Sequence, residues 1–175
     1  MPSYVALLRA VNVGGTGKLA MSDLKVMCAA EGFTKVATYI ASGNVVFCAD
    51  GSAAQVKTAL ERRLHDYAGK PVGVIVRTAD EMAAVHSANP FADQPPNRVV
   101  AIFLDEPPPA DALDDVRGRG DEELQLGSCE IYVAYGAGMR DSKLRIPIAA
   151  RGTARNINTI AKLSEMAAAL RSAGE

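Results

Sequence analysis

The sequence predicts an α+β protein of 175 residues. Short runs rich in Val, Ile and Ala alternate with stretches whose apolar residues recur every three or four positions, which indicates strands alternating with helices. An Ala-Ser-Gly-Asn turn at 41–44 separates two of the runs and predicts an antiparallel hairpin. The first six elements follow the order βαββαβ, the split βαβ arrangement of a ferredoxin-like unit. We therefore expect a ferredoxin-like βαββαβ N-terminal half followed by a related βαββαα C-terminal half.

Three segments are expected along the chain. The ferredoxin-like half spans 1–77, a connecting helix and loop span 78–97, and a second α+β half ending in a long helix spans 98–175. A chain of this length suits one compact unit.

The N-terminal half is expected to hold four strands and two helices. The strands are 4–11, 35–40, 45–49 and 72–76, and the helices are 23–31 and 52–67. Helix ends carry local signals: an N-cap at Ser22, a left-handed C-terminal glycine at Gly32, and capping-box spacing at Ser52/Gln55 and Thr78/Glu81. The helix after Thr78 should end by Asn89-Pro90, because the residue before a proline disfavours the helical conformation.

The C-terminal half is expected to hold three strands and three helices. The strands are 98–104, 123–126 and 130–135, and the helices are 111–116, about 142–144, and 157–171.

Composition limits the class of protein. The net charge is −1, which argues against a generally basic nucleic-acid binder. Three cysteines without short spacing fit reduced thiols better than a disulfide framework, and two histidines cannot supply a His/Cys zinc cluster. No signal peptide is visible at the start, and no apolar run is long enough to span a bilayer. We expect a cytoplasmic, soluble protein without a metal or cofactor.

The glycine-rich stretch at 12–18 first suggests a phosphate loop between a strand and a helix. A Walker A loop fails because Asn12 stands at the first glycine position and Leu19 at the hydroxyl position. A loose G-x-G-x-x-A dinucleotide pattern is present, but no acidic residue stands near the end of the next strand, which enters a hairpin. The stretch is either a tight turn that needs residues with positive φ or a general anion-binding site.

Two sets of cations could serve an anionic ligand. Arg9 lies inside the first apolar run. Three interpretations of it are open: its side chain points to solvent, it pairs with an acidic side chain, or it is a ligand-binding cation beside the glycine turn. Residues 140–155 hold five bases and one acid and lead to Asn156, a natural N-cap whose helix start would present free N–H groups. The alternative for this second set is a basic face that neutralises the acidic 105–123 segment, which has eight acids and two arginines.

Several sites are disfavoured. An RNA-recognition sheet needs stacking aromatics, and 42–48 offers only Phe47. Ser142 and Lys143 are adjacent, so their side chains would point apart on a helix rather than form a catalytic pair.

Nearly the whole chain resembles the bacterial family catalogued as domain of unknown function 1697. The residues that carry the resemblance are Leu8-Arg9-Ala-Val-Asn12-Val-Gly14-Gly15, Lys18, Met21, Thr38-Tyr39, Ser42-Gly43-Asn44-Val-Val-Phe47, Val76-Arg77-Thr78, Asn89-Pro90-Phe91, Gly138, Ser142-Lys143-Leu144 and Thr153-Ala-Arg155-Asn156-Ile-Asn158-Thr159. Ala10 departs from the family's usual glycine, Ile157 from a frequent tryptophan, and the stretch from Lys143 to Arg155 is shorter than in many members. The resemblance implies an α+β protein with ferredoxin-like character and implies no activity.

The best functional hypothesis is a binding module for a phosphate-bearing ligand, either a nucleotide or a nucleic-acid backbone, in a cleft between the two halves. The candidate ligand-binding residues are Arg9, Asn12, Gly14, Gly15, Lys18, Ser42, Asn44, Ser142, Lys143, Arg155, Asn156 and Asn158. One alternative is a small-molecule enzyme of unknown reaction that uses the same polar set, with Ser42 or Ser142 taking part. The other is a partner-binding protein that uses the charge-split second half.

Overall fold

The computed structural model describes residues 1–11, 18–136, 139 and 142–173. These residues form two four-stranded antiparallel sheets and four α-helices, so the predicted α+β class is confirmed. The chain divides into two compact units, one made of 1–83 with 162–175 and the other of 84–161. Helices α3 (Ala79–Ser87) and α4 (Ile157–Ala173) each begin in one unit and end in the other.

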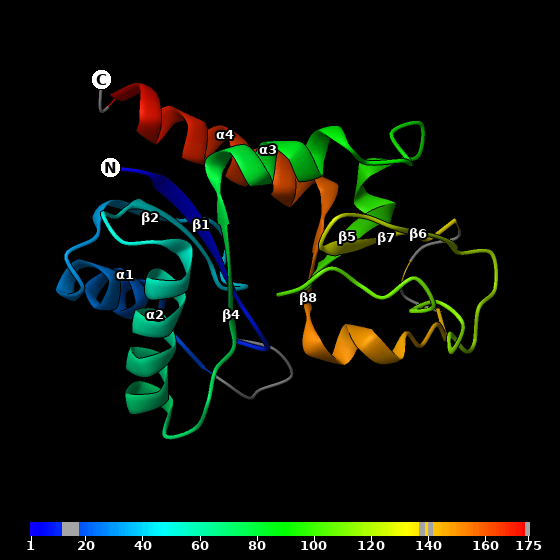
Figure 1. The fold of residues 1–175 in the computed structure, drawn as a ribbon, viewed down its shortest axis with the longest axis horizontal. Helices are drawn as coiled ribbons and strands as arrows, with labels where there is room; N and C mark the ends of the chain where they lie inside the picture. Colours follow the sequence, from blue (N-terminus) through cyan, green and yellow to red (C-terminus); the bar gives the residue numbers. More distant parts are fainter. Residues whose placement is uncertain (12–17, 137–138, 140–141, 174–175) are drawn as a thin grey trace. The chain divides into compact units, whose positions relative to one another are not determined.

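The first sheet has the strand order β2-β3-β1-β4, and all neighbouring strands are antiparallel (Figure 1). Its strands are β1 (Ser3–Leu8), β2 (Thr34–Thr38), β3 (Asn44–Cys48) and β4 (Val74–Thr78). Every residue of the two central strands, β1 and β3, is buried, which accounts for their nearly continuous apolar sequence. Helices α1 (Met21–Ala30) and α2 (Ala53–Ala68) cover one face of this sheet.

The core of the first unit lies between that face and the two helices. Tyr4, Ala6 and Leu8 point toward the helices, because side chains alternate between the faces of a strand. The helices contribute apolar residues spaced three or four apart, which places them on one helical face. The Phe33 and Phe47 rings stack on each other, with their centroids 4.5 Å apart.

The predicted capping boxes are confirmed. Ser52 and Gln55 exchange side-chain-to-backbone hydrogen bonds at the start of α2. Thr78 and Glu81 do the same at the start of α3, which ends at Ser87, before the proline. These bonds satisfy N–H groups that a helix start leaves without partners.

Helix α1 confirms one predicted end and contradicts the other. Gly32 has a φ of +83°, and the Phe33 N–H donates to the Cys28 carbonyl at 3.1 Å, as in a glycine C-terminal cap. The predicted N-cap at Ser22 is wrong, because the helix begins at Met21 and its N-cap, Ala20, has no side-chain oxygen.

The second sheet repeats the strand order of the first. Its strands are β5 (Val99–Phe103), β6 (Glu123–Leu126), β7 (Glu130–Ala134) and β8 (Thr153–Asn156), in the order β6-β7-β5-β8. All neighbouring pairs are antiparallel. Strand β5 therefore occupies the position that β1 has in the first sheet.

One face of the second sheet is covered by non-α-helical segments. Val100, Ile102 and Ile131 form its core, and partly buried apolar residues from the connections around 113 and 144–149 pack on it. Tyr132 lies on the opposite face, where its hydroxyl donates to the Val85 carbonyl of α3 at 2.7 Å.

The predicted βαββαα order of the C-terminal half is wrong in three places. Residues 110–115 form turns rather than a helix, and 142–144 have no regular structure; a 3₁₀ helix, η2 (Pro147–Arg151), follows instead. The acidic side chains in 111–116 repel one another at helical spacing, which disfavours that helix. Strand β8 was not predicted, because four residues are too few for a period-two pattern and its stability comes from pairing with β5.

Candidate functional site

A pocket of about 180 Å³ lies within the first unit, where β1 ends and the loop between α2 and β4 begins. The described residues that line it are Arg9, Ala10, Val11, Lys18, Leu19, Leu64, Tyr67, Ala68, Lys70, Pro71 and Val72. Three of them are cationic, none is acidic, and most of the others are apolar. This composition suits a ligand with a negative group and a less polar body.

Arg9 is held at the end of β1 by the neighbouring strand. Its backbone N–H donates to the Gly73 carbonyl at 2.9 Å. Its side chain runs across Gly73, because a Cβ atom there would lie only 3.0 Å from the Arg9 Cδ atom. The glycine therefore leaves the space in which the half-buried arginine lies.

Lys18 and Lys70 bring two further cations to the pocket, and both are exposed. Lys70 follows Gly69, which ends α2 with a φ of +72°. The left-handed glycine turns the chain away from the helix axis and toward β4.

Tyr67 forms part of the pocket wall and is tied to α1. Its hydroxyl donates to the Asp23 carboxylate at 2.9 Å. This hydrogen bond is the main reason that the pKa of Tyr67 is raised from its ordinary value. The ring is half-exposed, so one side is available to a bound molecule.

The β2–β3 turn contains two candidate residues whose polar atoms stabilise the turn. The Asn44 amide donates to the Tyr39 carbonyl at 3.0 Å and to Ser42 Oγ at 2.9 Å, and Asn44 is fully buried. Gly43 joins the turn to β1 through its carbonyl, which accepts from the Leu8 N–H at 2.9 Å. These contacts give Ser42 and Asn44 a structural role.

Ser142 is likewise engaged in the second unit. Its hydroxyl donates to the buried Glu122 carboxylate, and its oxygen accepts from the Leu144 N–H at 3.2 Å. Lys143 is exposed, and its carbonyl fits against Gly118, where an added Cβ atom would approach within 2.0 Å. Ser142 therefore anchors this loop to Glu122.

The last candidates lie at the junction of β8 and α4. Asn156 is the predicted N-cap, since its side-chain oxygen accepts from the Thr159 N–H at 2.8 Å. Arg155 is buried in β8, where its guanidinium donates to Thr153 Oγ1 at 2.7 Å and to the Ala154 carbonyl at 2.9 Å. Burial lowers the pKa of Arg155 to about 10. Asn158 is exposed in the first turn of α4.

Comparisons with known proteins place the chain in a family. Residues 1–132 match the model of the family described as Protein of unknown function (DUF1697). The chain belongs to this family. No curated protein matches it.

This DUF1697 protein also has a structural relative. The conserved bacterial protein SP0830 from Streptococcus pneumoniae is similar to it with a TM-score of 0.78 and 24% sequence identity. The match covers 95% of this chain and 98% of that chain. At this identity the likeness shows the fold alone, so a function must be argued from the side chains.

The predicted ligand-binding residues of this DUF1697 protein fall into separate groups. Four candidates belong to the first unit: Arg9 and Lys18 line its pocket, and Ser42 and Asn44 lie where β2 turns into β3. Five candidates belong to the second unit: Ser142, Lys143, Arg155, Asn156 and Asn158. Three lie outside the described residues: Asn12, Gly14 and Gly15. The cleft between the two halves stays a prediction.

Two residues that line this pocket, Lys70 and Tyr67, are not among the candidates that the sequence indicates. A signal for Lys70 was available, because β1 and β4 are antiparallel neighbours in a split βαβ sheet. The loop that leads into β4 must then lie beside the residue that follows β1, which is Arg9. Tyr67 carried no comparable signal, since its side-chain direction depends on how α2 packs.

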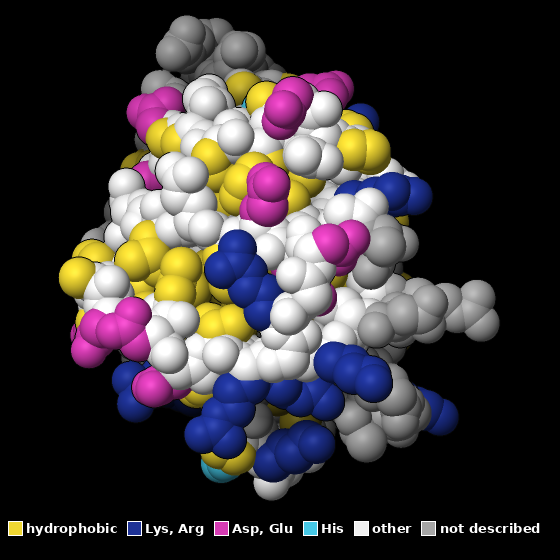
Figure 2. Space-filling model, turned by 90° about the vertical axis from the view of Figure 1, so that its right-hand side faces the viewer, with side chains coloured by type: hydrophobic (Ala, Val, Ile, Leu, Met, Phe, Trp, Pro, Cys, Tyr) yellow, Lys and Arg dark blue, Asp and Glu magenta, His cyan; other side chains and the backbone are white. Residues whose placement is uncertain are grey.

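The protein surface carries both signs of charge. Figure 2 shows Lys and Arg side chains as well as Asp and Glu side chains exposed on one face, with hydrophobic side chains between them. No helix in the described part of the chain has the length and apolarity that crossing a bilayer requires. Across the same residues, no group of three or more His, Cys, Asp or Glu side chains could hold a metal ion.

Proposed function

We propose that this protein binds a phosphate-bearing ligand in the pocket lined by Arg9, Lys18 and Lys70. The observation that supports the proposal is that three cations and no acid stand among the described lining residues. A phosphate group is attracted by such a concentration of positive charge, and arginine can bind it through two parallel N–H groups.

The size of the pocket limits which part of the ligand it holds. A volume of about 180 Å³ lies below the roughly 300–1,000 Å³ of pockets that hold drug-sized ligands. The pocket therefore suits a phosphate group with a small adjoining part, such as a sugar ring. The exposed Tyr67 ring at its wall is a surface on which a planar base could stack.

A nucleotide and a nucleic-acid backbone both offer this chemistry, and we favour the nucleotide. The second unit's candidates Arg155 and Asn156 already have hydrogen-bond partners. A long backbone-tracking groove would need further cations, whereas a mononucleotide needs only the cations of this pocket.

The test is calorimetric or NMR titration of the full chain with AMP, ATP, adenosine and inorganic phosphate at low salt. AMP and ATP should bind, adenosine should bind much more weakly, and affinity should fall as salt is raised, because exposed charges are screened. Short RNA and DNA in a filter-binding assay separate a nucleic-acid ligand from a nucleotide.

Matched variants make the test specific to the pocket. Lys18→Gln and Lys70→Gln should each weaken AMP binding by roughly fivefold to tenfold, the size of one exposed charge-assisted contact of about 1 kcal/mol. Lys25→Gln removes an exposed lysine of α1 that is not among the residues lining the pocket, and should leave binding unchanged. Equal effects of all three substitutions, or equal binding of adenosine and AMP, would contradict the proposal.

We also propose that each sheet with its covering segments is a ferredoxin-like unit. Support comes from the strand orders β2-β3-β1-β4 and β6-β7-β5-β8, in which all neighbours are antiparallel. The second unit would be a variant in which short irregular segments replace the two covering helices. An experimental structure in which either strand order differed would refute this assignment.

The enzyme hypothesis receives no specific support. Ser42 and Ser142 both hydrogen-bond to side chains that stabilise their own loops, Asn44 and Glu122. A nucleophilic serine needs a neighbouring base within hydrogen-bond reach. The Asn44 amide is not a base, and the Glu122 carboxylate, although it accepts from Ser142, has a lowered pKa and is therefore a weak one. The partner-binding hypothesis stays a prediction.

A further inference from the structure

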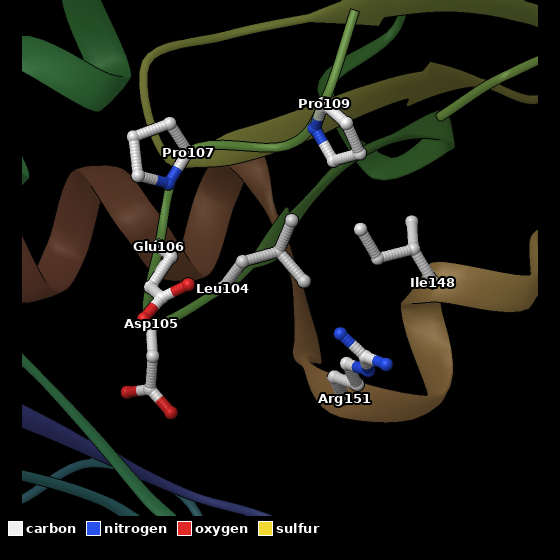
Figure 3. Close-up of a pocket in the computed structure, with 7 residues that line it drawn as sticks. All are labelled: Leu104, Asp105, Glu106, Pro107, Pro109, Ile148 and Arg151. Carbon is white, nitrogen blue, oxygen red and sulfur yellow. The ribbon is translucent and has the colours of Figure 1, made fainter. Parts of the chain in front are cut away.

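A second cavity, of about 290 Å³, lies within the second unit (Figure 3). The described residues that line it are Leu104, Asp105, Glu106, Pro107, Pro109, Ile148 and Arg151. They come from the segment after β5 and from η2. None of them is among the named candidate ligand-binding residues, although Arg151 belongs to the basic 140–155 segment, and none lines the proposed phosphate pocket.

The backbone around this cavity holds its walls in place. A 3₁₀ helix has three residues per turn, so Ile148 and Arg151 of η2 lie on the same side of it. Gly152 lets η2 approach the end of β5 closely, because a Cβ atom there would lie 2.3 Å from the Phe103 carbonyl oxygen and 2.9 Å from Leu104 Cδ2. The prolines on the other side have fixed φ angles, which stiffens that wall.

Three charged residues line this cavity, and two of them, Glu106 and Arg151, border an apolar surface. Figure 3 shows the Glu106 carboxylate and the Arg151 guanidinium on either side of the Leu104 side chain. No hydrogen bond or ion pair found among the described residues involves either group, and both residues are exposed. The Leu104, Ile148 and proline side chains supply the apolar area between and above the charges.

We infer that this cavity binds a free α-amino acid with an aliphatic side chain. Arg151 receives the α-carboxylate, for which its planar guanidinium is geometrically suited. Glu106 receives the α-ammonium group, and the side chain of the ligand packs on Leu104 and Ile148.

The charge pattern selects this ligand class over others. Glu106 and Asp105 repel a phosphate group, which lacks a compensating positive charge. A purely apolar molecule would gain nothing from the two charged groups. The volume of about 290 Å³ lies just below the roughly 300–1,000 Å³ of pockets that hold drug-sized ligands, which suits a small molecule such as leucine.

Calorimetric or NMR titration of the full chain with four compounds tests each contact separately. L-leucine should bind best. N-acetyl-leucine lacks the ammonium group, leucinamide lacks the carboxylate, and glycine lacks the side chain, so each should bind at least about tenfold more weakly, the size of one charge-assisted or apolar contact. A peptide ending in leucine that bound as tightly as free leucine would overturn the amino-acid assignment in favour of a protein terminus.

Two variants link each preference to its residue. Arg151→Gln should abolish the preference for leucine over leucinamide, and Glu106→Gln should abolish the preference for leucine over N-acetyl-leucine. Arg117→Gln and Glu123→Gln remove exposed charges of the same unit that do not line the cavity, and should leave both preferences intact. Absence of leucine binding at millimolar concentration, or preferences unchanged in the two cavity variants, would overturn the inference. Because AMP binding concerns the other unit, it should be unaffected by these variants.

Discussion

Replacing Gly43 by alanine should destabilise the first unit much more than replacing either of two other left-handed glycines. Gly43 has a φ of +88°, and an added Cβ atom would lie 2.6 Å from Val11 Cγ2 and 2.8 Å from Leu8 Cβ. Both neighbours are buried, so neither can move freely into solvent. The substitution therefore combines backbone strain with overpacking.

The two terms can be estimated separately. An alanine in the left-handed region costs about 1–2 kcal/mol, and overpacking of a buried site costs about 1–3 kcal/mol. The expected loss in the free energy of unfolding is therefore roughly 2–5 kcal/mol. Gly69 has a φ of +72° and Gly32 a φ of +83°, and an added Cβ atom at either would meet nothing within 4 Å. Gly69→Ala and Gly32→Ala should therefore lose only the backbone term, about 1–2 kcal/mol each.

Urea unfolding followed by far-ultraviolet circular dichroism measures these differences. Amide hydrogen exchange supplies a local probe, because the Leu8 N–H donates to the Gly43 carbonyl. Exchange at Leu8 should accelerate in Gly43→Ala and stay close to wild type in Gly69→Ala. If the two variants lost the same free energy, the close approach of the turn to β1 would not contribute, and the reasoning would be refuted.

Three further outcomes are expected. Ala10→Gly should stabilise the protein by about 0.5–1 kcal/mol. Ala10 has a φ of +54°, and relief of the backbone strain at this angle exceeds the entropic cost of glycine. A lower midpoint of thermal unfolding in the variant would contradict this. Burial raises the pKa of the Cys28 thiol to about 12, so iodoacetamide at pH 8 should label the partly exposed Cys129 first and Cys28 only after denaturation, as mass spectrometry can show. The hydrogen bond from Ser142 and two backbone hydrogen bonds lower the pKa of Glu122. Ionised Glu122 therefore stabilises the folded protein fully above the unfolded-state pKa of about 4.3. This stabilisation is lost as the pH falls through the pKa of the folded state. The difference in unfolding free energy between wild type and Glu122→Gln should therefore narrow below about pH 4.3, and a difference that grew on acidification would count against this assignment.

Only the part of the pocket at the end of β1 could be predicted from the sequence. Arg9 and Lys18 lie close together in sequence, on the two sides of the glycine stretch, and both line the pocket. Lys70 reaches the same pocket because β4 pairs with β1, which is a contact between distant segments. The side chain of Asn44 donates a hydrogen bond within its turn and is fully buried, and the turn sequence alone does not indicate that burial.

The sequence by itself determined the kind of each element in the first half and the positions of several helix ends. The capping boxes at Ser52 and Thr78, the glycine after α1 and the β2–β3 turn depend on bonds between residues only a few positions apart. Such bonds are encoded locally, so their residue patterns can be recognised without knowing the fold.

Only the tertiary structure decided the identity of β8, the burial of Arg155 and the composition of the two pockets. Strand β8 is a strand because β5 offers it hydrogen-bonding partners, and Arg155 is buried within it. Glu106 and Arg151 come to one cavity because η2 packs on the end of β5, although nothing near either residue in sequence indicates the other. Contacts between distant segments depend on strand pairing and packing across the whole unit, and no local pattern records them.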